Sequence, residues 1–290
     1  MPDPIFDPLA GPKWVLDGRI VPMTAPTAIV DDGRIYIDGG KIVAVQEADA
    51  PHPPGFEGAK VVSTGGTIYP GMVELHNHLA YNVLPLWNVP KPYSNRDQWG
   101  RHKDYRRLIS GPMSVLGRTD GLVQAVVRWA EAKCLVGGTT TSQGIALYSN
   151  AGITKYYRGL VRNVEETNDP ELPEASTRIG DVEAGSGAKF LARLESHRDK
   201  GKKLILHLAE GTDDRANDHF RALKIDDRRW AINEALVGIH GTGLRNRNFR
   251  TMAVRGGSVV WSPLSNLLLY GDTTDIRRAI DDEVTLSLIH

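Results

Sequence analysis

The chain has 290 residues, of which 41% are hydrophobic and 24% are charged, a composition typical of a globular protein with a sizeable core. Its 35 Lys and Arg balance its 35 Asp and Glu, so the formal net charge is zero and no overall field would attract nucleic acid or an anionic membrane surface. A small molecule is therefore the expected partner.

The first twelve residues contain four prolines and no basic segment, so they do not have the pattern of a secretory signal. No uncharged apolar run approaches the length that spans a membrane. These two features predict a cytoplasmic protein. Cys134 is the only cysteine, so no intramolecular disulfide can form, and its place in an expected helix favours packing over nucleophilic chemistry.

From residue 14 to residue 70 the sequence alternates short β-type runs with turns rich in Gly, Asp and Pro. This spacing predicts a small antiparallel β unit, which we assign to residues 1–66. The expected strands are residues 14–16, 19–21, 34–37, 41–45 and 60–63.

After residue 67 apolar strands alternate with longer helical stretches, which favours parallel β/α units and the α/β class. We therefore predict that residues 67–290 form a TIM (β/α)8 barrel that is incomplete at its last strand. The expected strands lie at residues 73–75, 139–144, 159–163, 204–208, 237–239, 259–261 and 284–288, with a weaker candidate at 176–182. Helices are expected at residues 121–136, 188–200, 218–233 and 274–282.

Residues 79–115 do not fit this alternation and are predicted to be a long loop. The segment is rich in aromatic residues and directly follows a strand, so we favour a wall of the substrate pocket over a simple packing flap. The candidate substrate-binding residues in it are Trp87, Trp99, Arg101 and Tyr105, although these side chains could also merely pack.

Two histidines, His76 and His78, directly follow the first strand of the expected barrel. In an extended segment residues i and i+2 point to the same side, so both imidazoles can reach one ion. His207 and His240 end two later strands, and the carboxyl ends of barrel strands meet at one mouth. The four histidines together predict a metal centre, since neutral imidazole is a common ligand of divalent metals.

Glu210 follows His207 by three residues, where that strand enters its loop. A carboxylate at such a place can take a proton from an activated water and pass it to a leaving amine. The alternative is an acidic residue that only begins a helix.

At this point the sequence resembles the amidohydrolase superfamily, and specifically its aminohydrolase and chlorohydrolase branch, which includes cytosine and guanine deaminases. The resemblance rests on an ordered set of segments: Leu16-Asp-Gly-Arg-Ile-Val, Ile37-Asp-Gly-Gly-Lys-Ile-Val, Ile68-Tyr-Pro-Gly-Met-Val-Glu-Leu-His-Asn-His, Gly137-Gly-Thr-Thr-Thr, His207-Leu-Ala-Glu, Gly238-Ile-His-Gly and Trp261-Ser-Pro-Leu-Ser-Asn. It implies that the N-terminal unit is part of a composite β-sandwich.

The resemblance also implies a role for each site residue. His76, His78 and His207 would be metal ligands, Glu210 the proton shuttle, and His240 the residue that orients or polarises the attacked group. Ser265 and Asn266 match the polar pair after the seventh strand, and Asn266 would bind the substrate. Residues 176–183 offer no convincing bridging lysine, so one divalent metal is expected, zinc before iron.

The sequence departs from this family at its carboxyl end. The branch carries an aspartate at the end of the eighth strand, whereas here Ile289 and His290 stand where that segment should continue. We therefore expect a truncated chain. The function expected is metal-dependent hydrolysis of non-peptide C–N bonds, for example in a nitrogen heterocycle. The alternative is an impaired remnant that only binds metal or ligand. A structural metal site is less favoured, because such sites are local in sequence. Homo-oligomerisation stays open.

Overall fold

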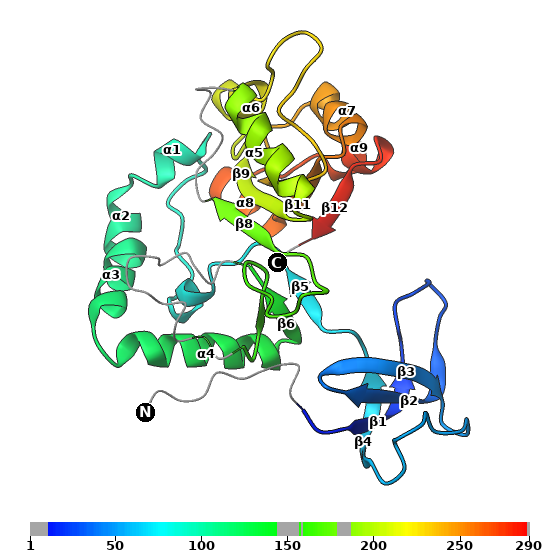
Figure 1. The fold of residues 1–290 in the computed structure, drawn as a ribbon. Helices are drawn as coiled ribbons and strands as arrows, with labels where there is room; N and C mark the ends of the chain where they lie inside the picture. Colours follow the sequence, from blue (N-terminus) through cyan, green and yellow to red (C-terminus); the bar gives the residue numbers. More distant parts are fainter. Residues whose placement is uncertain (1–10, 144–156, 158, 179–186, 289–290) are drawn as a thin grey trace.

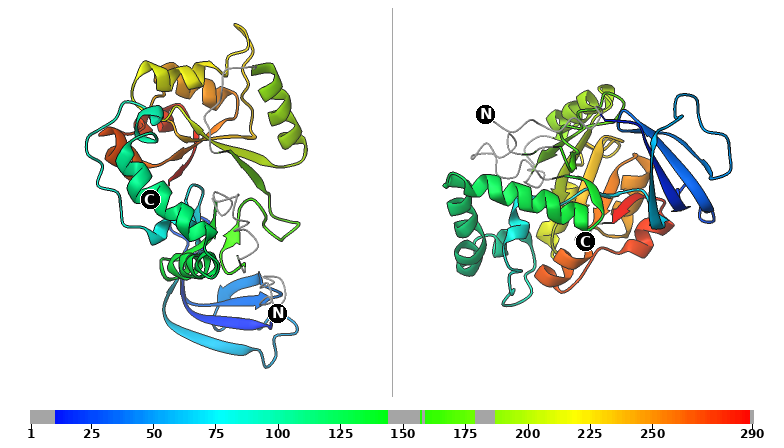
Figure 2. Two further views of the ribbon diagram at one scale, coloured as in Figure 1. Left: turned by 90° about the vertical axis from the view of Figure 1, so that its left-hand side faces the viewer. Right: turned by 90° about the horizontal axis from the view of Figure 1, so that it is seen from below.

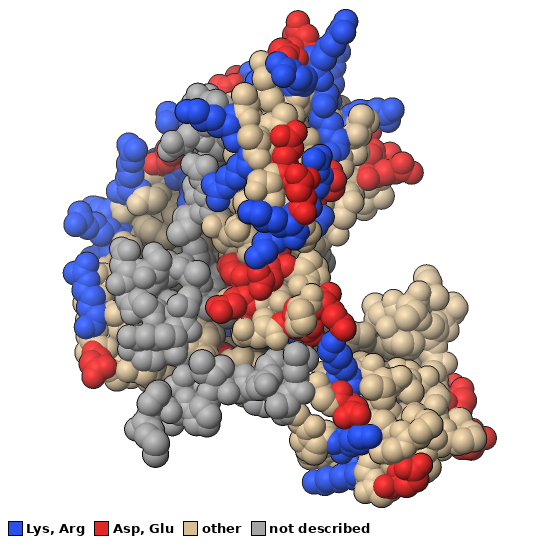
Figure 3. Space-filling model, viewed as in Figure 1, with Lys and Arg blue, Asp and Glu red and all other residues tan. Residues whose placement is uncertain are grey.

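The computed structural model describes residues 11–143, 157, 159–178 and 187–288. Figure 1 shows a small β-sheet that projects from a larger body of strands and helices. Both views in Figure 2 show the same arrangement, with the small sheet at one end of the molecule. Basic and acidic side chains both occur over the face drawn in Figure 3, in agreement with the zero net charge.

The small sheet consists of β1 (Trp14–Ile20), β2 (Val30–Asp38), β3 (Lys41–Glu47) and β4 (Lys60–Ile68), in the order β3-β2-β1-β4. The strands β1, β2 and β3 are antiparallel neighbours, but β4 pairs in parallel with β1. The prediction of an antiparallel unit is therefore wrong for β4. The reason is the connection from β3 to β4, which is long enough to carry the chain across to the far side of β1. Val15, Tyr36 and Phe56 form the sheet's small core.

The two short runs predicted at residues 14–16 and 19–21 belong to one strand, β1. The register of β1 shifts between Gly18 and Ile20, which is the irregularity that looked like a turn in the sequence. A side chain at Gly18 would lie 2.5 Å from Thr64 Oγ1 on β4, so glycine allows the two strands to approach here. Within the described residues this unit is a single layer, and the predicted sandwich is not seen.

The larger body contains two parallel sheets, which confirms the α/β class. One sheet has the order β5-β6-β7 and the other β12-β11-β10-β9-β8. Their bounds are β5 (Met72–Glu74), β6 (Thr139–Ser142), β7 (Arg162–Asn163), β8 (Ala175–Arg178), β9 (Lys203–Leu208), β10 (Leu236–His240), β11 (Ser258–Trp261) and β12 (Thr285–Leu288). A backbone hydrogen bond from Ala175 N to Val164 O, 2.9 Å long, links the sheets. Over the described residues no pairing of β12 with β5 closes a barrel.

Most predicted strands of this body are found within a few residues of their expected places. The weak candidate at residues 176–182 is β8, although residues 179–182 lie outside the described part of the chain. The same holds for residue 144 of the predicted second strand, and for the positions from 179 to 183 that were searched for a bridging lysine. The carboxyl-terminal Ile289 and His290 also lie outside it.

The core of the body lies on both faces of the five-stranded sheet. Leu204, Leu206 and Leu208 of β9 pack with residues of the helices, whereas Ile205 packs with Val237 on the opposite face. This is the alternation that a strand imposes on its side chains. His207 shares the face of Ile205, and that face is the one on which the candidate site is built.

The helices of the body are α1 (Arg96–Trp99), α2 (Lys103–Tyr105), α3 (Gly111–Arg118), α4 (Leu122–Val136), α5 (Gly187–Asp199), α6 (Asp214–Arg221), α7 (Asn246–Val254), α8 (Pro263–Tyr270) and α9 (Ile276–Asp281), with a 3-10 helix at Leu79–Val83 and a π-helical turn at Arg106–Ser110. None of the described helices is long and apolar enough to cross a membrane. Cys134 is buried in α4, as predicted.

The prediction that residues 79–115 form a long loop is wrong at Leu79–Val83, which is a 3-10 helix, and again from Asn95 onward. The side chain of Asn95 accepts a hydrogen bond from Asp97 N, and the His102 ring accepts one from Asp104 N, so each caps a short helix. Pro112 lies in the first turn of α3, where its fixed φ suits a helix. Helix α6 ends at Arg221 rather than near residue 233, because Ile225 N binds Arg229 O and turns the chain back.

Candidate metal centre and substrate pocket

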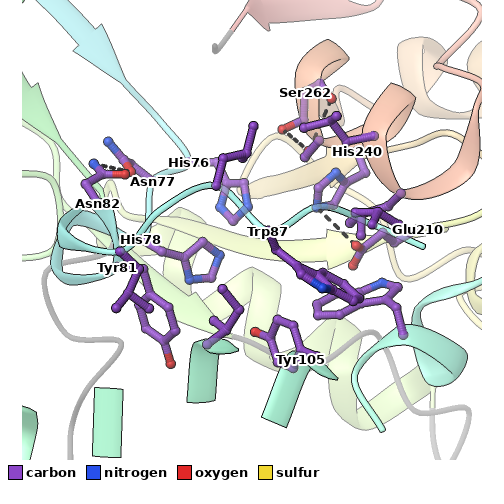
Figure 4. A pocket seen from close by; sticks show the side chains of 18 of the residues that line it. His76, Asn77, His78, Tyr81, Asn82, Trp87, Tyr105, Glu210, His240 and Ser262 are labelled. Atoms are coloured by element: carbon purple, nitrogen blue, oxygen red, sulfur yellow. Dashed lines mark hydrogen bonds and ion pairs between the residues drawn. The ribbon is translucent and has the colours of Figure 1, made fainter. Parts of the chain in front are cut away.

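Four imidazoles meet at the carboxyl ends of the parallel strands, and Figure 4 labels three of them, His76, His78 and His240. His76 and His78 follow β5, His207 lies near the end of β9, and His240 is the last residue of β10. The backbone of His240 has φ +72°, a left-handed conformation that is uncommon for a residue with a side chain. This conformation interrupts the alternation of side-chain directions at the end of β10. The His240 side chain therefore lies next to that of His207.

Three of the four side chains form a group that could hold a metal ion. One ring nitrogen of each of His76, His207 and His240 lies within 4.8 Å of the others. The ring centroid of His76 lies 4.9 Å from that of His207 and 5.3 Å from that of His240. His78 is adjacent, with its ring 4.9 Å from that of His76 and 6.3 Å from that of His207. The structure thus brings all four predicted histidines together, but the tightest trio contains His240 in place of His78.

Burial and electrostatics keep three imidazoles of the cluster neutral, those of His76, His78 and His207. Burial lowers the pKa of His76 and of His207 well below its usual value, and the neighbouring histidines lower it further. Burial, and to a smaller extent the neighbouring His240, lowers the pKa of His78 to about 4. A neutral imidazole has a lone pair to offer, as a metal ligand must. Nδ1 of His76 and Nδ1 of His207 are buried and have no hydrogen-bond partner among the described residues, so this donor set fits a divalent ion.

His240 is held in one orientation by its neighbours. Thr274 Oγ1 donates its only hydrogen to His240 O at 2.5 Å, so the same oxygen can only accept from Asn266 Nδ2, 3.4 Å away. The amide oxygen of Asn266 then faces His240 Nδ1 at 2.8 Å and accepts its proton. In the neutral ring, Nε2 therefore carries the lone pair. Asn266, a predicted substrate-binding residue, is fully buried and is not part of the pocket lining.

Glu210 lies beside this cluster and is 2% exposed. Its Oε1 accepts a hydrogen bond of 2.7 Å from the Tyr270 hydroxyl and lies 3.7 Å from His240 Nε2. Its Oε2 is buried, has no hydrogen-bond partner among the described residues, and lies 3.6 Å from Arg96 Nε. Burial and the adjacent Glu210 raise the pKa of the Tyr270 phenol, so it stays protonated and can donate.

The cluster opens into a cavity of about 600 Å³. The aromatic wall predicted from the sequence is present, because Trp87, Trp99 and Tyr105 line the cavity, with Trp87 and Tyr105 in edge contact at 5.5 Å. The predicted Arg101 is exposed and does not line it. Ser265, in the predicted polar pair, does.

Several lining residues were given no role in the sequence analysis, namely Asn77, Asn82, Arg96, Lys133, Ser262, Leu268 and Leu269. Tyr270, which binds Glu210 from outside the lining, was also missed. Its position four residues after Asn266, one helical turn on, was a usable signal. Arg96 gave no signal, since nothing in the sequence pairs it with Glu210.

The segment that carries the aromatic wall is fixed directly to the loop that carries Glu210. Thr212 N donates to Ser94 O at 2.7 Å, and Arg96 N donates to Glu210 O at 3.2 Å. Gly211 makes this approach possible, because a Cβ at its position would lie 2.5 Å from Ser94 O. The pocket wall and the Glu210 backbone therefore form one unit.

Solved structures of three kinds of enzyme share this fold. A triazine hydrolase from Arthrobacter aurescens is 17% identical with a TM-score of 0.70, over 96% of this chain and 71% of its own. A guanine deaminase from C. acetobutylicum with guanine in its active site is 13% identical with a TM-score of 0.63, over 96% and 74%. An adenosine deaminase from Xanthomonas campestris with bound zinc is 18% identical with a TM-score of 0.59, over 95% and 68%. No protein-family model and no curated protein matches the sequence.

Proposed function

We propose that this chain, which has the fold of the triazine hydrolase and of the two deaminases, is a metal-dependent amidohydrolase that hydrolyses a C–N bond of a small, non-peptide substrate. The observation that carries the proposal is the meeting of neutral imidazoles and one buried carboxylate at the carboxyl ends of parallel strands. This edge is where enzymes of parallel α/β folds place their catalytic groups. The sequence motifs and the fold support the same family independently.

His76 and His207 would hold the ion, since both the sequence pattern and the geometry select them. His240 would be the third ligand in the arrangement described, because it belongs to the group of three and Asn266 fixes its Nδ1–H, which leaves the lone pair on Nε2. His78, which the sequence analysis expected as the third ligand, lies beside this group, with its ring centroid 4.9 Å from that of His76. A single zinc ion fits three imidazoles, and iron is the alternative that the same ligands accept. An adenosine deaminase with bound zinc and an atrazine chlorohydrolase complexed with zinc and atraton are among the similar structures.

When bound, the metal would supply Lewis acidity and make water a nucleophile near neutral pH. Glu210 would accept the proton of the attacking water and donate it to the leaving nitrogen, since its Oε2 has no hydrogen-bond partner among the described residues. The Arg96 guanidinium forms an ion pair with that oxygen, with Nε 3.6 Å away. The low exposure of Glu210 excludes bulk water from this transfer.

The lining favours a planar, largely apolar substrate such as a nitrogen heterocycle. Trp87, Trp99 and Tyr105 offer aromatic surface for stacking or edge contact with a flat ring. The guanine and atraton found in similar structures are substrates or ligands of this shape, which supports the same class here. We also propose that residues 1–66 are a unit separate from the catalytic body. The cytoplasmic location and any homo-oligomer stay predictions.

The test is an assay of ammonia release by the zinc-loaded chain on guanine, adenosine, cytosine and amino-substituted triazines. The matched control is Glu210→Gln, which keeps the shape of the side chain but cannot carry the proton. We expect turnover of at least one compound, and a fall in kcat of about 10²–10⁴ in the variant at equal bound zinc. Equal rates in the two proteins, or no turnover by either, would contradict the proposed function.

A further inference from the structure

Tyr270 is buried at the end of α8 and connects Glu210 to the aromatic wall of the pocket. Its hydroxyl lies 2.7 Å from Glu210 Oε1 and 2.8 Å from Trp99 Nε1. The backbone fixes it from both sides, because Tyr93 N donates to Leu269 O at 2.7 Å and Gly271 ends the helix in a left-handed conformation. The position of the hydroxyl is thus set by the fold and not by a rotatable surface side chain.

The direction of the two hydrogen bonds follows from the chemistry of the groups. An indole N–H can only donate, so Trp99 Nε1 gives its hydrogen to the Tyr270 oxygen. A phenol has one hydrogen, and with its oxygen accepting from the indole, that hydrogen must go to the carboxylate. The chain Trp99 to Tyr270 to Glu210 therefore has a single polarity.

This polarity makes the two oxygens of Glu210 different. Oε1 receives the Tyr270 hydrogen, whereas Oε2 is buried without a hydrogen-bond partner among the described residues and has the Arg96 guanidinium near it, 3.6 Å away. A carboxylate that is held at one oxygen has its plane fixed, and the other oxygen then points in a defined direction. Glu210 and Trp99 both line the cavity, so the fixed plane is presented to the substrate.

We propose that Tyr270 is a positioning residue that holds Oε1 of Glu210, so that Oε2 is the oxygen that transfers protons. The proposal rests on the proposed function for the transfer itself. The orientation of the carboxylate, however, can be measured in the absence of turnover. Tyr270 makes no contact with substrate in this account and acts only through Glu210.

The test compares Tyr270→Phe with Tyr93→Phe. Tyr93 belongs to the same aromatic cluster and is buried, but its hydroxyl has no hydrogen-bond partner among the described residues. Both changes remove one hydroxyl from the same cluster and keep the ring, so any difference reports the bond to Glu210. Crystal structures of the zinc-loaded wild type and of both variants give the first measurement.

In the wild type and in Tyr93→Phe, we expect Glu210 in the single orientation described, with Oε1 against residue 270. In Tyr270→Phe the carboxylate should rotate or occupy more than one orientation. On a substrate that the wild type turns over, kcat should fall by about 10–100-fold in Tyr270→Phe with KM nearly unchanged, because only the transfer geometry is lost. The zinc content should not change.

The same Glu210 orientation in wild type and Tyr270→Phe would overturn the proposal, whether or not any substrate is turned over. An equal loss of kcat in Tyr93→Phe would also overturn it, because the effect would then come from cluster packing. If no compound is turned over by the wild type, the proposed function fails, and the crystal structures alone decide whether Tyr270 orients Glu210.

Discussion

Substitution of Gly211 by alanine should separate the pocket wall from the Glu210 loop. Gly211 has φ +138°, a conformation that is essentially restricted to glycine, and a residue with a side chain there is strained by about 1–3 kcal/mol. The added Cβ would also lie 2.5 Å from Ser94 O and 2.6 Å from Asn95 Cα, both backbone atoms. The backbone must therefore move, which would weaken or break the hydrogen bonds from Thr212 N to Ser94 O and from Arg96 N to Glu210 O.

Each lost backbone hydrogen bond costs about 0.5–1.5 kcal/mol, and the strain adds to it. We expect Gly211→Ala to lower the free energy of unfolding by about 3–5 kcal/mol. The matched control is Gly201→Ala, because Gly201 has φ +66° but no atom within 4 Å of the added Cβ. That variant should lose only about 1–2 kcal/mol, the cost of the left-handed backbone. Urea unfolding followed by circular dichroism measures both. If the two variants differ by less than about 1 kcal/mol, the close approach at Gly211 is not what holds the wall.

Three further predictions concern the site. Asn266→Ala removes the hydrogen-bond acceptor of His240 Nδ1 and should weaken zinc binding by about 10–100-fold in a chelator competition. Unchanged zinc affinity would mean that His240 is not a ligand of the ion. His240→Ala should weaken zinc binding more than His78→Ala in the same competition, because His240 belongs to the tightest trio and His78 does not. The reverse order would favour His78 as the third ligand, as expected from the sequence. Trp87→Leu should raise the KM measured by steady-state kinetics, because Trp87 lines the cavity. The control Arg101→Ala, at an exposed position outside the lining, should leave KM within about twofold of the wild-type value.

The elements that sequence patterns predicted well are those that depend on local periodicity. His207 could be placed at the mouth because it ends an apolar run, and parallel strands bring such ends together. The turn at His240, with its positive φ, could not be predicted, because its cause is packing against Thr274 and Asn266. The short helices after Asn95 were missed for a similar reason: each depends on one capping side chain rather than on an apolar stripe.

The contacts of Glu210 show a second limit. Tyr270 and Arg96 are 60 and 114 positions from it in the sequence, and neither stands in a recognisable motif. Their convergence depends on how α8 and the 92–99 segment pack over the strand ends. A sequence pattern can name the carboxylate, whereas only the folded chain shows which of its oxygens is held.

The central claim is that the buried imidazoles bind a divalent metal, and the zinc content of the purified full chain tests it most directly. After dialysis against limiting zinc, mass spectrometry should find about one ion per chain in the wild type and in His52→Ala, whose histidine is exposed in the connection between β3 and β4. His76→Ala and His207→Ala, with circular dichroism spectra like that of the wild type, should each retain less than about a tenth of this zinc. Equal zinc in all four proteins would contradict the account.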